Sequence, residues 1–196
     1  VIMEEPGKVV VEDRPMPTLL EPTDAVIKLA ASCICGSDLW PYRGAQPVDH
    51  QQMGHEYIGE VIEVGDDVKT VKPGDFVVGS FCISCGECAT CQDGYPSRCL
   101  KAIAAGDGFI GMRSNGTQAE YARIPFADGT LVKTPAYPTA EQIPHLMAAS
   151  DVLGTGWYAA DAAKAAQVRL LLWLVMVPLV WAQLLGLSSW ALKRSS

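Results

Sequence analysis

Positive charge is scarce in this chain. Its 196 residues contain 15 Lys and Arg against 22 Asp and Glu, which gives a formal net charge of −7. A surface that binds nucleic acid needs clustered cations, so the charge balance gives no electrostatic support for such a partner. Internal repeats are also absent, which excludes a repeat architecture.

A secretory signal is missing from the start of the chain, and we expect a cytoplasmic protein. Val1 is not a start methionine, so we expect a few N-terminal residues to precede it. Clustered cysteines in a protein that is not exported favour metal binding over disulfides. A disulfide-rich secreted protein is the alternative. The length suits one domain with room for part of a second.

Residues 1–150 predict a mainly β domain. Runs that are typical of strands lie at 8–12, 25–29, 57–64, 76–78, 119–124 and 131–133. Turns that contain glycine or proline separate them, and many short strands between such turns indicate a barrel or a sandwich. Helical periodicity becomes clear only at 141–147 and 155–166.

Five of the seven cysteines fall within eighteen residues: Cys82, Cys85, Cys88, Cys91 and Cys99. Cysteines separated by two residues on a tight turn bring their thiolates to one point, and four thiolates form a closed tetrahedral Zn²⁺ site. Spacing alone does not choose which four bind. An iron–sulfur cluster is the other metal interpretation, although the Cys-Pro ending of ferredoxin-type runs is absent.

A second candidate metal site combines Cys35, in the run Cys-Gly-Ser-Asp, with His55 and Glu56, in the run Gly-His-Glu-Tyr. A thiolate, an imidazole and a carboxylate are the ligand types of an open, catalytic zinc site. Zinc in such a site lowers the pKa of a bound water or alcohol and polarises a carbonyl. On spacing alone, a core cysteine and a turn histidine explain the pair equally well.

Four motifs follow one another along the chain: Cys35-Gly-Ser-Asp, Gly54-His-Glu, Lys72-Pro-Gly-Asp and Cys85-Gly-Glu-Cys-x₂-Cys-x₇-Cys99. This set resembles the zinc-dependent alcohol dehydrogenases of the medium-chain dehydrogenase/reductase superfamily, from the N-terminus to about residue 166. The resemblance implies that residues 1–150 form a partly open, mostly antiparallel β-barrel of the chaperonin-10-like (GroES-like) kind. A structural zinc loop protrudes from that barrel, and residues 151–166 form a helix that leads toward a cofactor domain.

The resemblance also assigns ligands for two zinc ions per chain. It implies that a structural zinc binds Cys85, Cys88, Cys91 and Cys99. Cys82 is then left without a ligand role. The resemblance implies a catalytic zinc on Cys35, His55 and Asp151, with the Glu56 carboxylate approaching the same ion. An Asp ahead of a helix is also a common N-cap, so capping is the alternative role for Asp151.

The remaining roles concern the substrate and the cofactor. The resemblance implies that Ser37 hydrogen-bonds the substrate alcohol and relays its proton, and that Asp38 orients the zinc-bound His55. Thr155 matches a family position near the cofactor. Trp40 stands where many relatives have a histidine that completes the proton relay, and we expect it to shape the substrate pocket instead.

The implied reaction is hydride transfer between a small alcohol or aldehyde and NAD or NADP. Zinc stabilises the alkoxide, Ser37 passes the proton on, and the nicotinamide takes the hydride. The resemblance further implies a homo-oligomer in the intact family.

The cofactor-binding half of this family is not visible in the sequence. Residues 106–111 fit G-x-G-x-x-G as a string, but they follow no predicted strand and open no predicted helix, so we reject them as a dinucleotide fingerprint. After residue 166 the family continues with a strand and a genuine fingerprint, whereas this chain has thirteen consecutive apolar residues at 170–182. We therefore expect a chain truncated before its Rossmann domain and inactive by itself.

Two explanations of residues 167–196 stay open. The first is a reading-frame slip near Gln167, because the codons for residues 173–181, read two bases later, permit Val-Gly-Asp-Gly-Ala-Val-Gly-Leu. The second is a membrane anchor at 170–187, which would make the protein a non-enzymatic, zinc-stabilised barrel tethered to a membrane. That run has eighteen residues with Pro178 and Gln183 inside, and a span needs about 20 apolar residues. For the chain as a whole, a misfolded product is a further possibility, because the family's catalytic domain also uses residues from beyond the cofactor domain. Exposed apolar residues in the tail would then promote aggregation.

Overall fold

The computed structural model describes residues 1–106, 108–110 and 116–162. The chain divides into two units, Val1–Met147 and Ala148–Ser196. The tail at 167–196 lies outside the described residues, and so do the expectations that concern it. Within the described residues, no helix is both long enough and apolar enough to cross a membrane.

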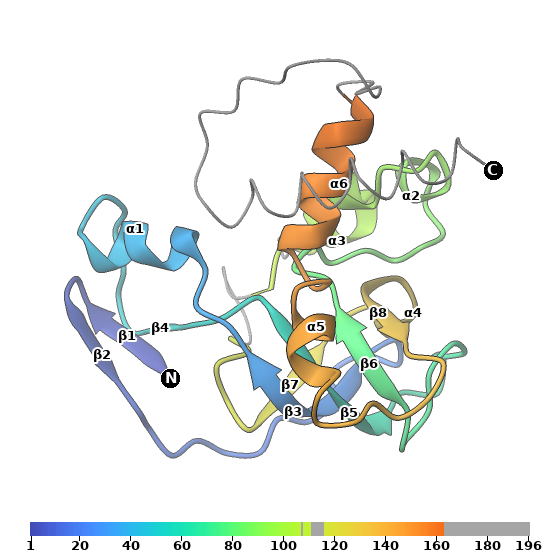
Figure 1. Ribbon diagram of the computed structural model, residues 1–196, viewed down its shortest axis with the longest axis horizontal. Helices are drawn as coiled ribbons and strands as arrows, with labels where there is room; N and C mark the ends of the chain where they lie inside the picture. The colour runs from blue at the N-terminus through green and yellow to red at the C-terminus, as the bar shows by residue number, and fades with distance from the viewer. Residues whose placement is uncertain (107, 111–115, 163–196) are drawn as a thin grey trace. The chain divides into compact units, whose positions relative to one another are not determined.

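The first unit is built on two antiparallel sheets (Figure 1). The larger sheet has the strand order β7-β3-β5-β6-β8, and its members are β3 (Ala25–Ser32), β5 (Tyr57–Val64), β6 (Phe76–Gly79), β7 (Tyr121–Ile124) and β8 (Leu131–Lys133). The smaller sheet has the order β2-β1-β4, formed by β1 (Ile2–Glu5), β2 (Lys8–Val10) and β4 (Gln51–Gln52). The mainly β character predicted from the sequence is confirmed.

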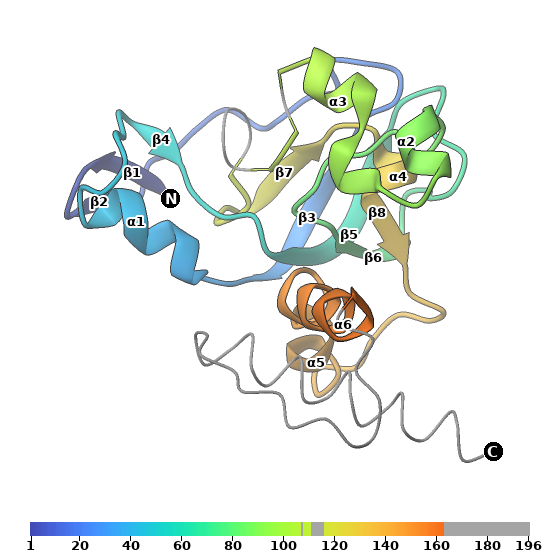
Figure 2. The ribbon, with the colours of Figure 1, turned by 90° about the horizontal axis from the view of Figure 1, so that it is seen from above.

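Short helices connect the strands of the first unit. They are η1 (Gly36–Asp38), α1 (Leu39–Tyr42), α2 (Ala89–Gln92), η2 (Pro96–Arg98), α3 (Leu100–Ala104), α4 (Ala127–Thr130) and α5 (Ile143–Met147). Figure 2 shows α2 and α3 on one side of the larger sheet and α5 on the other. The described part of the second unit contains α6 (Val152–Ala162).

Alternation along the strands places an apolar core on each face of the larger sheet. Tyr57 and Val77 belong to the larger core, which also contains Ile83, from the segment between β6 and α2, and Ala102 of α3. The residues next to them along the strands, such as Ile58, belong to a smaller core with Met147 of α5. Because successive side chains of a strand point to opposite faces, a sheet buried on both faces needs apolar residues in both registers.

The Lys72-Pro-Gly-Asp75 motif forms the turn before β6. Gly74 has a φ of +89°, a left-handed conformation that glycine adopts without strain. The Asp75 carboxylate accepts a hydrogen bond from the Lys72 backbone N–H at 3.0 Å and forms an ion pair with Lys133 of β8 at 2.7 Å. The motif therefore ties the β5–β6 turn to the neighbouring strand.

The fold differs from the sequence-based expectation mainly at short elements. The strands expected at 57–64 and 131–133 have the predicted bounds, whereas the one expected at 8–12 ends at Val10. Strands β1 and β4 were missed. Gly106 and Gly108 follow helix α3, and Phe109 forms an isolated antiparallel bridge with Cys82, which agrees with the rejection of residues 106–111 as a strand–loop–helix fingerprint. Positions 107 and 111 of that string lie outside the described residues.

We predict that Arg123→Ala lowers the free energy of unfolding by about 3 kcal/mol, as urea denaturation would measure. Asp24 is 1% exposed, and its carboxylate accepts a hydrogen bond from the Arg123 guanidinium at 2.7 Å across the β3–β7 pair. Removal of Arg123 leaves a buried carboxylate without its cation. Arg14→Ala, at an exposed position, is the control and should change stability by less than about 0.5 kcal/mol. Equal effects of the two substitutions would contradict a stabilising role for the buried pair.

Candidate metal centres

Four cysteine sulfurs converge in the loop that carries α2 and α3. The Sγ atoms of Cys85, Cys88, Cys91 and Cys99 lie within 4.8 Å of one another. Cys88 Sγ lies 3.4 Å from Cys91 Sγ and 3.9 Å from Cys99 Sγ. Four sulfurs bound to one tetrahedral zinc at about 2.3 Å would lie about 3.8 Å apart. The cluster therefore has the dimensions of a closed, four-thiolate zinc site.

Backbone N–H groups point at these sulfurs. Cys85 Sγ accepts a hydrogen bond from the Cys88 N–H at 3.3 Å. Cys99 Sγ accepts two, from Cys85 at 3.3 Å and from Ala102 at 3.4 Å. Gly86, with a φ of +72°, makes the tight turn between the first two cysteines. Donors aimed at sulfur stabilise the thiolate form, which is the form that binds a metal.

The thiols of this cluster differ in acidity. The Thr90 hydroxyl beside Cys88, together with the Cys91 N–H, lowers the pKa of the Cys88 thiol to about 5. Burial raises the pKa of Cys91 to about 12, and burial also raises the pKa of Cys85. Binding of zinc to all four sulfurs would therefore release protons from the weakly acidic thiols.

Cys82 is not one of the four clustered cysteines. It is 8% exposed, its N–H donates to Ser80 Oγ at 3.1 Å, and it bridges Phe109 in the antiparallel pair noted above. The structure thus groups the four cysteines that the family resemblance singled out from the five in the run. Their role as ligands stays a prediction.

The second group of donors lies where β3 ends and β5 begins. Cys35 follows β3 by three residues, and His55 and Glu56 directly precede β5. Donor atoms of these three side chains lie within 4.8 Å of one another. Cys35 and His55 are partly buried, and Glu56 is 5% exposed. Thiolate, imidazole and carboxylate in one cluster suit a zinc site that retains an open position.

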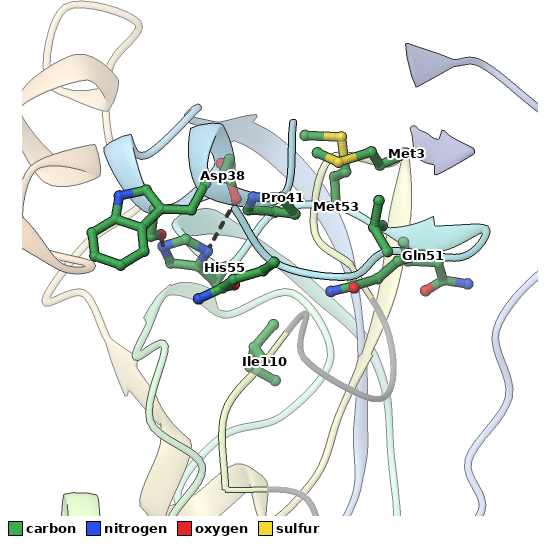
Figure 3. A pocket seen from close by; sticks show the side chains of 13 residues that line it. Met3, Asp38, Pro41, Gln51, Met53, His55 and Ile110 are labelled. Atoms are coloured by element: carbon green, nitrogen blue, oxygen red, sulfur yellow. Dashed lines mark hydrogen bonds and ion pairs between the residues drawn. The ribbon is translucent and has the colours of Figure 1, made fainter. Parts of the chain in front are cut away.

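Two polar side chains of η1 face opposite edges of the His55 ring. Nδ1 lies 3.6 Å from Asp38 Oδ1, and Nε2 lies 3.5 Å from Ser37 Oγ. Figure 3 shows Asp38 directed at His55. The other Asp38 oxygen accepts the Cys35 N–H at 2.9 Å, so this carboxylate contacts both the Cys35 backbone and the His55 ring. Such a carboxylate fixes the orientation of a metal-binding imidazole and leaves Nε2 for the metal.

Gly54 allows the chain to reach His55 past another segment. A Cβ atom at this position would lie 2.5 Å from the Gln118 backbone nitrogen, and the Gly54 φ is +97°. Gln118 N–H donates to the Met53 carbonyl, and Thr117 N–H donates to the Gly54 carbonyl, both at 3.0 Å. The glycine of Gly-His-Glu is therefore needed for this close backbone approach.

Asp151 and Thr155 belong to the second unit. Asp151 directly precedes α6, and its carboxylate accepts a hydrogen bond from the Thr155 hydroxyl at 2.9 Å. The Thr155 N–H donates to the Asp151 carbonyl at 3.0 Å. These contacts are local to the start of the helix. The zinc role predicted for Asp151 and the cofactor role predicted for Thr155 stay predictions.

A pocket of about 300 Å³ opens beside His55 within the first unit. Its lining contains Ser37, Asp38, His55 and Trp40, four of the residues that the sequence singled out. The Trp40 side chain is 56% exposed. The structure therefore places a hydroxyl, an oriented imidazole and an indole around one cavity.

Other residues of this region carry no motif and were missed in the sequence. Three glutamines from the segment between α1 and β5 also line the pocket: Gln46, Gln51 and Gln52. Apolar side chains complete this part of the lining: Met3, Val48, Met53 and Ile110. Phe81 packs edge-on against His55, with ring centroids 6.4 Å apart, and stacks on Phe109. The only signal that could have pointed to the glutamines was their closeness to Gly54-His55 in the chain.

Comparison with known proteins identifies relatives of this arrangement. The family model described as "Alcohol dehydrogenase GroES-like domain" matches residues 21–136. The chain is 43% identical over 162 residues to zinc-type alcohol dehydrogenase B of Aspergillus flavus, an alignment that covers 82% of this chain and 36% of that protein.

Solved structures of dehydrogenases are also similar to this chain. Alcohol dehydrogenase TADH from Thermus sp. ATN1 superposes with a TM-score of 0.73 at 32% identity, over 83% of this chain and 46% of that one. A putative zinc-binding dehydrogenase from Sinorhizobium meliloti 1021, bound to NADP, has a TM-score of 0.65 at 28% identity, over 83% and 44%. The chain thus spans less than half the length of each of these relatives.

We predict that Cys88→Ser removes one zinc ion per chain and markedly lowers the unfolding temperature, because structural zinc binding is coupled to folding. Elemental analysis of the purified chain and a thermal melt would measure both effects. Cys82→Ser is the matched control, since Cys82 lies outside the sulfur cluster. It should leave the zinc content unchanged and cost about 1 kcal/mol. Unchanged zinc in Cys88→Ser would show that the four-sulfur cluster is not a zinc site.

Proposed function

Because this chain belongs to the zinc-dependent alcohol dehydrogenases of the medium-chain dehydrogenase/reductase superfamily, we propose that it forms the metal- and substrate-binding part of an NAD(P)-dependent enzyme. The substrate is a small alcohol or aldehyde. The observation that carries the proposal is the orientation of His55. Its Nδ1 faces Asp38, and the ring lies in a donor cluster with Cys35 and Glu56 at the edge of a pocket.

We assign the catalytic zinc to Cys35, His55 and Asp151, with Glu56 close by. The donor set supports this, because sulfur, nitrogen and carboxylate oxygen are the ligand types of open zinc sites. Zinc held there would lower the pKa of an alcohol hydroxyl or polarise an aldehyde carbonyl. The assignment of Asp151 rests on its position in the sequence.

Ser37 is the proposed proton relay. Its hydroxyl lines the pocket and lies 3.5 Å from His55 Nε2, which is a long distance for a hydrogen bond. A hydroxyl held this loosely can exchange that contact for a hydrogen bond to the substrate oxygen and accept its proton as the hydride leaves. Trp40 is exposed at the pocket and has no ionisable proton, so we assign it to the pocket wall and expect the proton to pass from Ser37 to solvent.

We assign a structural zinc to the four-cysteine cluster. The backbone N–H groups that point at Cys85 and Cys99 support this role, because they stabilise thiolates in a site with no open position for substrate. Two zinc ions per chain follow from the two donor groups.

Asp151→Asn tests the ligand role against the capping role. Asparagine caps a helix as well as aspartate does, but it lacks the charged carboxylate. We expect the substitution to lower the affinity for the catalytic zinc by at least about tenfold in a chelator competition. Loss of a group that only hydrogen-bonds a zinc ligand already lowers metal affinity by about 10–100-fold. Asp161→Asn, on the same helix, is the control and should leave zinc affinity unchanged. If Asp151→Asn keeps zinc affinity and only Asp151→Ala shortens α6, capping is the role.

We further predict that the 196 residues alone bind zinc but do not sustain hydride transfer. The only G-x-G-x-x-G string in the sequence lies at 106–111, and its described glycines, Gly106 and Gly108, follow helix α3 rather than a strand. The loop that cradles the pyrophosphate of NAD(P) lies between a strand and a helix. The assay follows the absorbance of reduced nicotinamide in the presence of ethanol and either NAD or NADP. The chain should give the same absorbance as the Cys35→Ala variant, which lacks a proposed zinc ligand. Alcohol-dependent reduction of NAD(P) above that level would contradict the prediction.

A further inference from the structure

The segment that bears Cys35 has little packing to hold it in place. It leaves the sheet at the end of β3, where Ile34 is 73% exposed and Cys35 itself is only partly buried. A segment with few buried apolar contacts depends on hydrogen bonds for its position. The distance from Cys35 to His55 is therefore set by the hydrogen bonds that join their two segments.

A third segment, just before β7, is bound to the backbone that leads into His55. The Thr117 N–H donates to the Gly54 carbonyl, and the Gln118 N–H donates to the Met53 carbonyl, both at 3.0 Å. Both bonds are made by main-chain atoms. They fix the Cα of Gln118 beside the His55 segment whatever side chain it carries.

The Gln118 side chain reaches from there to the segment of Cys35. Its Nε2 donates a hydrogen bond to the Cys33 carbonyl at 3.2 Å. The Cys33 N–H donates in turn to the Glu56 carbonyl at 3.3 Å. Residue 33 is thus held at both its N–H and its carbonyl by groups that belong to, or are bound to, the His55 segment.

The contacts around the two proposed ligands form a closed cycle. The Cys35 N–H donates to one Asp38 oxygen at 2.9 Å, and the other lies 3.6 Å from His55 Nδ1. The cycle runs from the backbone before His55 to Gln118, from the Gln118 amide to Cys33, along the chain to Cys35, and through Asp38 back to His55. Hydrogen bonds that surround a site in this way hold its donor atoms at a fixed spacing.

We propose that Gln118 is a positioning residue for the catalytic zinc site, because its amide holds the Cys33 carbonyl and so sets the spacing of Cys35 and His55. The inference rests on the proposed function, since it takes these two residues as ligands of one zinc ion. Gln118 needs no contact with the metal or the substrate for this role. Donors that are already spaced for zinc lose less freedom on binding, so loss of the amide should lower the zinc affinity.

The test measures zinc affinity by chelator competition on the 196-residue chain. The zinc that Cys35→Ala abolishes is the one of interest, and the zinc that Cys35→Ala retains reports the four-cysteine cluster. Gln118→Met removes the amide and keeps a side chain of similar length. We expect it to lower the affinity for the Cys35-dependent zinc about fivefold, as loss of one hydrogen bond predicts, and to leave the cluster affinity unchanged.

Gln92→Met is the matched control. The Gln92 amide also donates to a main-chain carbonyl, that of Gly86 at 2.6 Å, but within the four-cysteine loop. The same substitution there should leave the affinity for the Cys35-dependent zinc unchanged. An equal loss of that affinity in Gln92→Met and Gln118→Met would contradict a specific role for Gln118.

Gln118→Ala keeps the proposal open to contradiction if Gln118→Met fails to fold. It removes the amide and the bulk of the side chain but keeps the N–H that binds Met53, and it should weaken the Cys35-dependent zinc as Gln118→Met does. A loss confined to Gln118→Ala would mean that packing matters and the amide does not, which would overturn the proposal. Unchanged affinity in both variants would overturn it as well.

A cobalt spectrum tests the geometry directly. With Co²⁺ in place of zinc, the difference between the spectra of the chain and of Cys35→Ala isolates the Cys35-dependent ion. Its absorption bands depend on how the donors are arranged, so they should shift in Gln118→Met. A residue that only stabilised the fold would leave them in place, and unshifted bands would overturn the positioning role.

The same measurements separate this proposal from the proposed function. If no zinc ion depends on Cys35 in the unchanged chain, the proposed catalytic site is wrong and the role of Gln118 fails with it. If a zinc ion depends on Cys35 but its affinity ignores Gln118, the proposed function stands and only the positioning role is wrong.

Discussion

The register between β3 and β5 is the constraint on which the rest of the site depends. Ser32 pairs with Tyr57 at the end of this antiparallel ladder, and the Cys33 N–H donates to the Glu56 carbonyl at 3.3 Å just beyond it. Cys35 and His55 are twenty residues apart in sequence and meet only because these strands end side by side. A slip of one residue would turn each side chain to the opposite face. Such a slip is costly because it would move the buried residues of these strands to the wrong face. Gly59 also restricts the register, because a Cβ at its position would lie 2.2 Å from the Lys28 carbonyl oxygen.

The cysteine loop links the two candidate metal centres mechanically. The Ile83 N–H donates to the Gly108 carbonyl at 3.1 Å, and the Ile110 N–H donates to the Phe81 carbonyl at 2.9 Å. These bonds close the loop that holds the four sulfurs. The same segment supplies Phe81 to the edge of the His55 ring and Ile110 to the pocket wall. A zinc ion that rigidifies the loop would therefore also stabilise the surroundings of His55, although that ion would lie outside the pocket.

Elements with a strong local pattern could be predicted, and those without one could not. The run at 57–64 is rich in aromatic and β-branched residues and ends at a Gly-Asp-Asp turn, and β5 has the same bounds. Strand β4 is only Gln51–Gln52, two polar residues that form a strand because β1 lies beside them. No local propensity marks such a pair. The same holds for helices of four or five residues, which are too short to show a helical period.

The sequence by itself determined the residue types of the two candidate zinc sites, the glycine that precedes His55, and the family to which these motifs belong. Those features are local, because a ligand or a positive φ is a property of one residue and its neighbours. Only the tertiary structure decided which sulfurs of five converge, which ring nitrogen of His55 faces Asp38, and that three glutamines share a pocket with Ser37. Such relations depend on distances between segments far apart in the chain, which strand register and backbone hydrogen bonds fix and which spacing along the sequence does not encode.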